Sequence, residues 1–453
     1  MGLTRYFAWV IVLLVGLASE VWSAPYASQL DNGLKLIVLP DHRAPVVMVQ
    51  VWYRVGSSYE SNGVTGISHA LEHMMFRGTA QIPNGAFSQT IAALGGTDNA
   101  FTSYDYTAYH ELVPSRALDQ VLAMEADRMH QLKFDPNLFE KEMKAVLEER
   151  RMRIDDRPMA LAQERFNAAA YVSSPYHHPV IGWVGDILEY RVQDALAWYQ
   201  QWYAPNNATV VIVGDVVPEK AMASVKKYFA DIPKRRLPTL KKRSSQKPML
   251  QQKLVASLPL PNARVQMAFH VPTLGSVPTS QRWQIFALSV LANALDSGSG
   301  GLLVEALQDQ KHWVSSLEVR YRAYRLHAGL FELQATLLPG VSLKQVTAAM
   351  QAQISMLVKQ PISPARLARI KAQVIASHVY AQDAIDSKAM HLGVLSALNL
   401  PLSLYDDYVK EIQQITPAQI QAVAQQFFDE KHRLVLWIKP LGTRRLSKHG
   451  GAS

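Results

Sequence analysis

The stretch His69-Ala70-Leu71-Glu72-His73 lies inside a segment with helical periodicity, residues 66–76. Apolar residues of that segment recur at i, i+4 and i+7, which predicts that they form its buried side: Ile67, Leu71 and Met74. Both histidines then share the opposite face, because four residues turn a helix by about 400° and advance it by about 6 Å. Two imidazoles at that spacing can bind one tetrahedral ion, and Glu72 is adjacent to the second. The pattern predicts a metal site with a carboxylate beside it.

A second helical segment, residues 139–150, offers further ligands for the same ion. Glu142 and Glu149 are seven residues apart and share one face within about 20°, whereas Glu148 points about 100° away. A catalytic zinc site has three protein ligands and an open fourth position, so we expect Glu149 to be the third ligand. Glu142 is expected to orient a ligand histidine. The alternative is an ordinary charged helix whose glutamates face solvent.

Composition restricts both the class of protein and its chemistry. The 453 residues are 49% apolar and 18% charged, which predicts a globular chain with more than one sizeable core. The chain has no cysteine, so disulfides, thiol nucleophiles, iron–sulfur clusters and cysteine-bound zinc are excluded. Any metal must therefore bind nitrogen and oxygen ligands.

Much of the excess positive charge, +9 overall, lies in two segments. Residues 234–247 hold seven basic side chains and no acidic one, with a proline and no apolar period. This composition indicates an interdomain linker, 234–248, between a domain at 25–233 and a second at 249–442. The other basic segment is a tail, 443–453. A basic run can also bind nucleic acid or anionic membranes, but an exported protein rarely meets nucleic acid and we expect no such partner.

The first 24 residues have the features of a secretory signal peptide: a basic start, an apolar run and small residues before the end. Cleavage is expected after Ala24, with Ala18 as a rival position. The alternative is an uncleaved anchor, but the apolar run is shorter than the ~20 residues that span a bilayer. We therefore expect an exported, periplasmic protein without stable membrane insertion after cleavage.

The expected fold class is α+β, because strands and helices mix without regular βαβ alternation. A strand pair at 34–39 and 46–55, joined by the proline-bounded turn 40–45, opens the first domain. A helix that ends in paired aromatic residues and precedes an apolar strand occurs twice, at 192–213 and 417–438. We expect two successive domains of similar plan, each an antiparallel-rich sheet with helices packed on one face.

Together these segments resemble the inverzincin metallopeptidases of the pitrilysin, insulysin and mitochondrial-processing-peptidase type. The resemblance rests on residues 66–79, 95–109 and 203–215 and on the helix that contains Glu142 and Glu149. These segments span most of the first domain, whereas the second domain matches the family in plan only.

The resemblance implies a zinc endopeptidase and assigns roles to the residues already singled out. His69, His73 and Glu149 would bind one zinc ion per chain, and Glu72 would be the general base that takes a proton from the attacking water. Glu142 would orient a ligand histidine without binding the metal itself.

The resemblance also implies a mode of substrate binding. In the family, the strand that corresponds to Asn99, Ala100 and Phe101 is a sheet edge to which the substrate adds as an extra strand. Recognition is then mostly through main-chain hydrogen bonds, so the expected substrates are extended or unstructured peptides.

One departure from the family concerns the second domain. Members that work alone have an arginine followed seven residues later by a tyrosine, and this chain has Gln308 and Ser315 at the aligned positions. The family includes two-chain enzymes, so we expect a heterodimer with a paralogous chain that supplies the Arg/Tyr pair, a homodimer being the alternative. A different functional class is also open: a metal-binding but weakly active scaffold, or a peptide-binding subunit of a two-chain complex.

Overall fold

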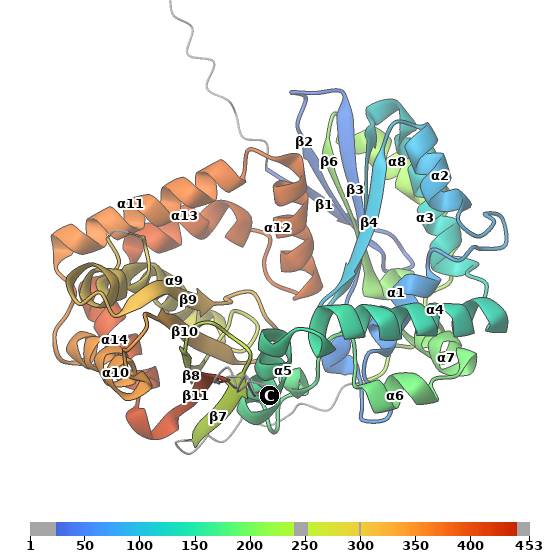
Figure 1. Ribbon diagram of the computed structural model, residues 1–453. Helices are drawn as coiled ribbons and strands as arrows, with labels where there is room; N and C mark the ends of the chain where they lie inside the picture. The colour runs from blue at the N-terminus through green and yellow to red at the C-terminus, as the bar shows by residue number, and fades with distance from the viewer. Residues whose placement is uncertain (1–23, 240–251, 299, 442–453) are drawn as a thin grey trace, which may run out of the picture.

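A computed structural model describes residues 24–239, 252–298 and 300–441 as two α+β domains that lie side by side (Figure 1). Residues 1–23 of the predicted signal peptide, residues 240–248 of the predicted linker and the basic tail lie outside the described residues. The predicted linker begins in contact with the first domain: the Arg235 backbone N–H donates to Asn206 Oδ1 at 3.0 Å, and the Arg235 guanidinium donates to the Tyr199 carbonyl at 2.9 Å. Within the described ranges, no helix has the length and apolar character needed to cross a membrane.

The first domain is built on a six-stranded sheet of order β1-β2-β6-β3-β5-β4. Its strands are β1 (Tyr26–Gln29), β2 (Lys35–Pro40), β3 (Val46–Tyr53), β4 (Thr97–Thr102), β5 (Thr107–Pro114) and β6 (Ala208–Gly214). Both strands of the expected pair form, but they are not neighbours, because β6 lies between them, parallel to β2 and antiparallel to β3. The apolar β6 is buried along its whole length and takes the central place. The turn at residues 40–45, which connects β2 to β3, therefore spans two inter-strand spacings, or about 10 Å.

The second domain repeats this plan with a five-stranded sheet of order β7-β11-β8-β10-β9. Its strands are β7 (Gln252–Leu258), β8 (Arg264–Val271), β9 (Val314–Tyr321), β10 (Gly329–Leu337) and β11 (Arg433–Pro440). β11 lies between β7 and β8 with the same parallel and antiparallel pairing that β6 shows. The helices that precede these two central strands are α7 (Val192–Trp202) and α14 (Pro417–Phe427). The predicted repeat of the domain plan is confirmed, and β4 and β9 are equivalent edge strands.

Each sheet has the helices of its own domain on one face. In the first domain these are α1 (Ile67–Met74), α2 (Ala86–Ala93), α3 (Leu118–His130), α4 (Pro136–Arg150), α6 (Val184–Glu189), α7 and α8 (Pro218–Phe229). In the second they are α9 (Trp283–Leu295), α10 (Leu343–Lys359), α11 (Pro364–Ala381), α13 (Leu404–Gln414) and α14. Alternation along β3 divides two cores: Val49 and Val51 belong to the core beneath the helices, whereas Met48 and Trp52 face the other way.

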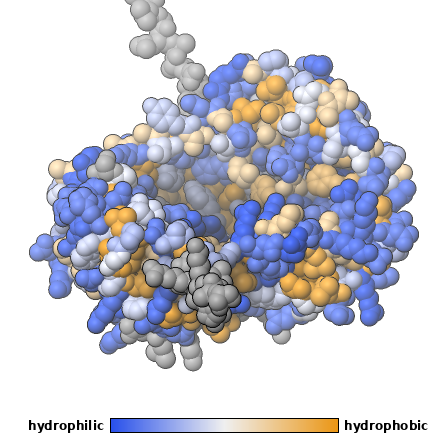
Figure 2. Space-filling view, viewed as in Figure 1, coloured by the Kyte–Doolittle hydropathy of each residue, from blue (hydrophilic) through white to orange (hydrophobic). Residues whose placement is uncertain are grey.

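The opposite face of each sheet is covered by a helix from the other domain. Helix α12 (Ile385–Ala397) packs on β3 and β6, where Gly393 lies so close to Trp52 that a Cβ atom would overlap the indole. Helix α5 (Pro158–Ala170) packs on the second sheet, where Phe166 shares a core with Leu436. This exchange fixes the two domains to each other and leaves a hollow between the lobes (Figure 2). A cavity of about 910 Å³ lies there, lined from both domains by residues that include His110 and Met390.

Candidate metal centre

A buried carboxylate sets the start of α1, the helix that contains both histidines. Glu60 accepts hydrogen bonds from the backbone N–H groups of Gly66 at 2.6 Å and Ser68 at 2.9 Å, which are free donors at a helix N-terminus. Burial raises the pKa of Glu60 to about 8 despite these bonds. Gly66 has φ 93°, and a Cβ atom there would overlap the Ile181 carbonyl oxygen, so the position requires glycine.

The structure brings His69, His73 and Glu149 together. His69 Nε2 lies 3.7 Å from Glu149 Oε1, and His73 Nε2 lies 3.3 Å from Glu149 Oε2. One ligand atom from each residue lies within 4.8 Å of the other two, and among the described residues this is the one group of three such side chains that could hold a metal ion. Donors around a tetrahedral zinc are about 3.4 Å apart, because Zn–N and Zn–O bonds are about 2.0–2.2 Å long. The three donors therefore fit one zinc ion.

Glu142 lies behind His73, on the side away from Glu149. Glu142 Oε2 is 3.5 Å from His73 Nδ1, and Glu142 Oε1 is 2.9 Å from Arg77 Nε. Burial disfavours the charged form of His73, but hydrogen bonds to Glu142 and Glu149 outweigh it and raise the pKa of His73 to about 9. Burial, followed by the neighbouring charge of His73, lowers the pKa of His69 to about 4. Without metal His69 is thus neutral and His73 is protonated, so a metal ion must displace the His73 proton.

Glu72 lies at the same centre but points to the sheet edge. Its Oε2 accepts a hydrogen bond of 2.5 Å from the hydroxyl of Thr102, the last residue of β4. Burial raises the pKa of Glu72, and the bond from Thr102 partly opposes that shift. A carboxylate with an elevated pKa beside a metal is suited to take and return a proton near neutral pH.

The adjacent glutamates of α4 have different surroundings, as the helical-face argument expects. Glu148 is about half exposed and pairs with Arg151, whose Nη2 lies 2.5 Å from Glu148 Oε1. Glu149 faces the histidines, and its Oε1 also pairs with Arg153 at 2.6 Å. Arg153 belongs to a π-helical turn, Arg151–Asp155, that continues α4 toward α5.

The residues expected to bind substrate lie on β4, the outer edge strand of the first sheet. Ala100 faces the same side as Thr102 and packs against the core beneath the helices. The Ala100 N–H donates to the side chain of Asn99 at 2.8 Å. Phe101 faces the other side, where it packs edge-on against Trp52 with ring centroids 5.6 Å apart. The outer edge of β4 therefore offers main-chain groups, whereas the Phe101 side chain packs in the protein interior.

Three residues at this centre received no role from the sequence: Arg77, Thr102 and Arg153. Arg77 follows His73 by four residues, and that spacing is a signal that could have placed it near Glu142. Thr102 lies within the quoted segment 95–109, but only strand pairing shows that it meets Glu72. Arg153 follows Glu149 by four residues, and this spacing is likewise a signal that could have placed it near Glu149.

The two positions that depart from the family lie in the second domain. Gln308 belongs to a π-helical turn, Val304–Gln310, and its carbonyl oxygen is 3.0 Å from His312 Nδ1. Ser315 is exposed on β9, and its hydroxyl donates to the Thr336 carbonyl at 3.3 Å. Tyr321, at the other end of β9, has a hydroxyl group that donates to the Pro272 carbonyl at 2.7 Å. None of these three side chains therefore offers the free guanidinium or the free phenol hydroxyl of the family's Arg/Tyr pair.

Comparison with known proteins agrees with this geometry. Residues 36–182 match the family model described as "Insulinase (Peptidase family M16)", and residues 190–374 match "Peptidase M16 inactive domain". The chain is 28% identical to the zinc protease PqqE of Helicobacter pylori over 450 residues, which are 95% of this chain and 97% of that protein. A crystal structure of a protease from the same organism has a TM-score of 0.84 at 27% identity and covers 92% of this chain and 99% of that one.

A longer relative has the same fold. The periplasmic protease PqqL of Escherichia coli matches with a TM-score of 0.76 at 19% identity, and the match covers 91% of this chain but 47% of PqqL. A crystal structure of the first half of PqqL covers 92% of both chains with a TM-score of 0.78. The two family models and the shared two-domain architecture show that this chain belongs to the M16 family of metallopeptidases, the family of insulinase and pitrilysin.

Proposed function

We propose that the chain is a zinc-dependent endopeptidase that hydrolyses extended or unstructured peptides. The observation that carries the proposal is the convergence of His69, His73 and Glu149 next to a second carboxylate, Glu72, at an open sheet edge. A site that only stored metal would have no need of a separate carboxylate held by Thr102. Relatives that are named zinc proteases support the same proposed function.

The chain's own residues divide the chemistry between them. Zinc bound by His69, His73 and Glu149 would polarise the scissile carbonyl and make water more acidic. Glu72 takes a proton from the attacking water and returns it to the leaving amine, and Thr102 keeps the Glu72 carboxylate aimed at the site. Glu142 holds the ring of His73 in place.

Peptide binding is proposed at β4. An added strand would bond to the main-chain groups of the segment Asn99–Phe101 that point outward, since successive residues of a strand alternate between its outer edge and the neighbouring strand β5. At Ala100 the incoming carbonyl would replace the Asn99 side chain as acceptor. Main-chain recognition requires an extended segment, so folded domains are poor substrates.

We propose that full activity requires a second two-domain M16 chain that completes the active site. Gln308 and Ser315 stand where single-chain members have arginine and tyrosine, and PqqL, a fold relative, has about twice the length of this chain. A paralogous chain with the Arg/Tyr pair would complete the site in a heterodimer; a homodimer is the alternative. The lack of this pair favours a second candidate function, a weakly active scaffold or peptide-binding subunit. The PqqL relative is described as periplasmic, which supports an exported protein here also.

The test compares cleavage of an unstructured peptide by the mature chain with and without a chelator, alone and mixed with a paralogue. Glu72→Gln should keep zinc and lose cleavage, whereas Glu148→Gln, a substitution on the exposed side of α4, should change neither. Cleavage that survives Glu72→Gln would refute the assigned mechanism. Metal binding without cleavage, in every mixture, would favour the scaffold function. Equal rates for the chain alone and the mixture would refute the need for a partner.

A further inference from the structure

Three arginines surround a small cavity where the two domains meet beside the C-terminal end of β4. The cavity has a volume of about 70 Å³ and is lined by Arg320, Arg322 and Arg325 from the second domain and by Tyr104, Asn167 and Tyr171 from the first, among others. A cavity needs about 10–15 Å³ of such space to hold one water molecule, so this cavity is large enough to admit a carboxylate group. The lining is a dense set of donors: guanidinium, phenol and amide groups.

The three arginines do not all have carboxylate partners. Arg320 pairs with Glu318, and its Nη2 donates to Glu318 Oε2 at 2.8 Å. Among the described residues, no ion pair is formed by Arg322 or Arg325. Glu332 also lines the cavity, but its carboxyl group accepts a hydrogen bond of 2.7 Å from the Gln266 side chain and, among the described residues, forms no ion pair with Arg322 or Arg325. Two positive charges are therefore left without a partner around a space that fits one carboxylate.

Arg325 is held in place by its surroundings. Its guanidinium carbon lies 4.8 Å from the centre of the Tyr104 ring and 4.9 Å from that of Tyr176. Its backbone carbonyl accepts hydrogen bonds from the Thr273 hydroxyl and the Gly275 N–H, both at 3.0 Å. A guanidinium fixed in this way loses little conformational entropy when it binds an anion.

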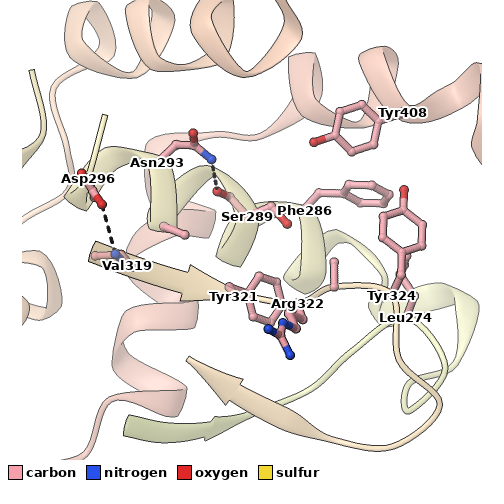
Figure 3. A pocket seen from close by; sticks show the side chains of 12 residues that line it. Leu274, Phe286, Ser289, Asn293, Asp296, Val319, Tyr321, Arg322, Tyr324 and Tyr408 are labelled. Carbon is pink, nitrogen blue, oxygen red and sulfur yellow. Dashed lines mark hydrogen bonds between the residues drawn. The ribbon is translucent and has the colours of Figure 1, made fainter. Parts of the chain in front are cut away.

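Arg322 is exposed and approaches the cavity from the turn after β9. It also lines a neighbouring cavity of about 480 Å³ between α9 and β9. Figure 3 shows its guanidinium directed away from Ser289 and Asn293 of α9. Arg322 is therefore free to turn toward an anion without breaking an ion pair.

The arginine cavity lies close to the proposed general base. Thr102 donates to Glu72, and Tyr104, two residues later, lines the cavity, so the two Cα atoms are at most about 7 Å apart. The connection is rigid, because the side chain of Asp105 accepts a hydrogen bond of 3.0 Å from the Leu326 N–H across the domain boundary.

We propose that this cavity binds a carboxylate of the peptide substrate, with Arg322 and Arg325 as its ligands. The carboxylate is either an acidic side chain or the C-terminus of the peptide, since both present the same planar group to guanidinium. An extended strand advances about 3.3 Å per residue, which places this carboxylate roughly two to four residues from the scissile bond. The inference rests on the proposed peptidase function and adds a preference for peptides that present a carboxylate at this position.

Binding to the full chain that carries Glu72→Gln tests the proposal without relying on hydrolysis. Fluorescence anisotropy would compare a neutral peptide with versions that have one glutamate at each position in turn, and with free or amidated C-termini. A charge-assisted bond predicts that one version binds about tenfold more tightly or better than the neutral peptide. In Arg322→Gln this ratio should fall toward one, and in Arg322→Lys it should fall partway. The matched control is Arg116→Gln, which removes an exposed arginine on the first domain and should keep the ratio.

The outcomes separate this inference from the proposed function. A gain from an internal glutamate identifies a side chain as the source of the carboxylate, and a gain from a free C-terminus identifies the chain end. Equal affinity for every version, or a preference that survives Arg322→Gln, overturns the inference, while Glu72-dependent cleavage of neutral peptides would still support the peptidase. An Arg322-dependent preference without any cleavage would instead support the cavity and refute hydrolysis.

Discussion

The adjacent carboxylates Glu148 and Glu149 give the sharpest test of the metal centre. They differ by one residue and about 100° of helix rotation, yet one oxygen of Glu149 is 3.3 Å from His73 Nε2 while Glu148 pairs with Arg151 at the surface. The perturbation is the same in both cases, Glu→Gln, which removes a charge and keeps the shape. Glu142→Gln completes the series, because Glu142 contacts His73 from behind without being placed as a ligand.

The structure ranks the three effects. Loss of a partner that orients a ligand typically weakens metal binding about 10–100-fold, which is the expected effect of Glu142→Gln. Glu149→Gln removes a ligand itself and should exceed that range, with a loss of more than about 100-fold. Glu148→Gln should leave the zinc affinity unchanged, because the Glu148–Arg151 ion pair is exposed to solvent and does not reach the histidines.

Competition with a chromophoric chelator measures the zinc affinity of each variant, and circular dichroism checks that each is folded. The order of loss should be Glu149, then Glu142, with no loss at Glu148. A loss at Glu148 that equals or exceeds the loss at Glu149 would show that the helix register is wrong by one residue. Equal losses at Glu142 and Glu149 would refute the division into ligand and supporting carboxylate.

Three further substitutions test features around the centre. Thr102→Val removes a bond that lowers the pKa of Glu72, so this pKa should rise and the acidic limb of the pH profile of kcat/KM should move to higher pH; an unmoved limb would show that Glu72 is not the titrating base. Arg128→Met leaves two fully buried glutamates without their cation and should lower the free energy of unfolding by about 3–5 kcal/mol in urea titrations. Gly393→Ala should destabilise the protein by about 1–3 kcal/mol through overlap with Trp52, although alanine normally favours a helix; a gain in stability would contradict the close packing.

Local patterns were sufficient for the elements that position the metal centre. The 3.6-residue periodicity around His69 and His73 identified α1, and the spacing of Glu142 and Glu149 put both on one face of α4. These predictions depend on residues within a few turns of one helix, where geometry is nearly fixed by the backbone. The repeat of helix and strand likewise identified the duplicated domain plan.

The same local patterns could not predict which strands and side chains pair when they lie far apart in the sequence. The sequence shows that β2 and β3 are strands, but the central strand β6 is more than 150 residues away, and nothing local indicates that it separates them. The apolar faces of α5 and α12 predict burial without saying against which sheet. For the same reason Thr102 was not linked to Glu72, and Arg322 and Arg325 had no visible relation to Tyr104.

The exchange of helices between the domains explains how a duplicated fold can build one composite site. The proposed zinc ligands come from the first domain alone, but the arginine cavity needs Tyr104 and α5 from the first domain and the end of β9 from the second. Because α5 follows α4 through a short π-helical turn, packing of α5 on the second sheet connects the proposed metal ligand Glu149 to the arginines. A change at the interface, such as Gly393→Ala, should therefore affect the binding of peptides that present this carboxylate more than the binding of zinc. In this proposal, the second domain takes part in substrate recognition and does not require a metal site of its own.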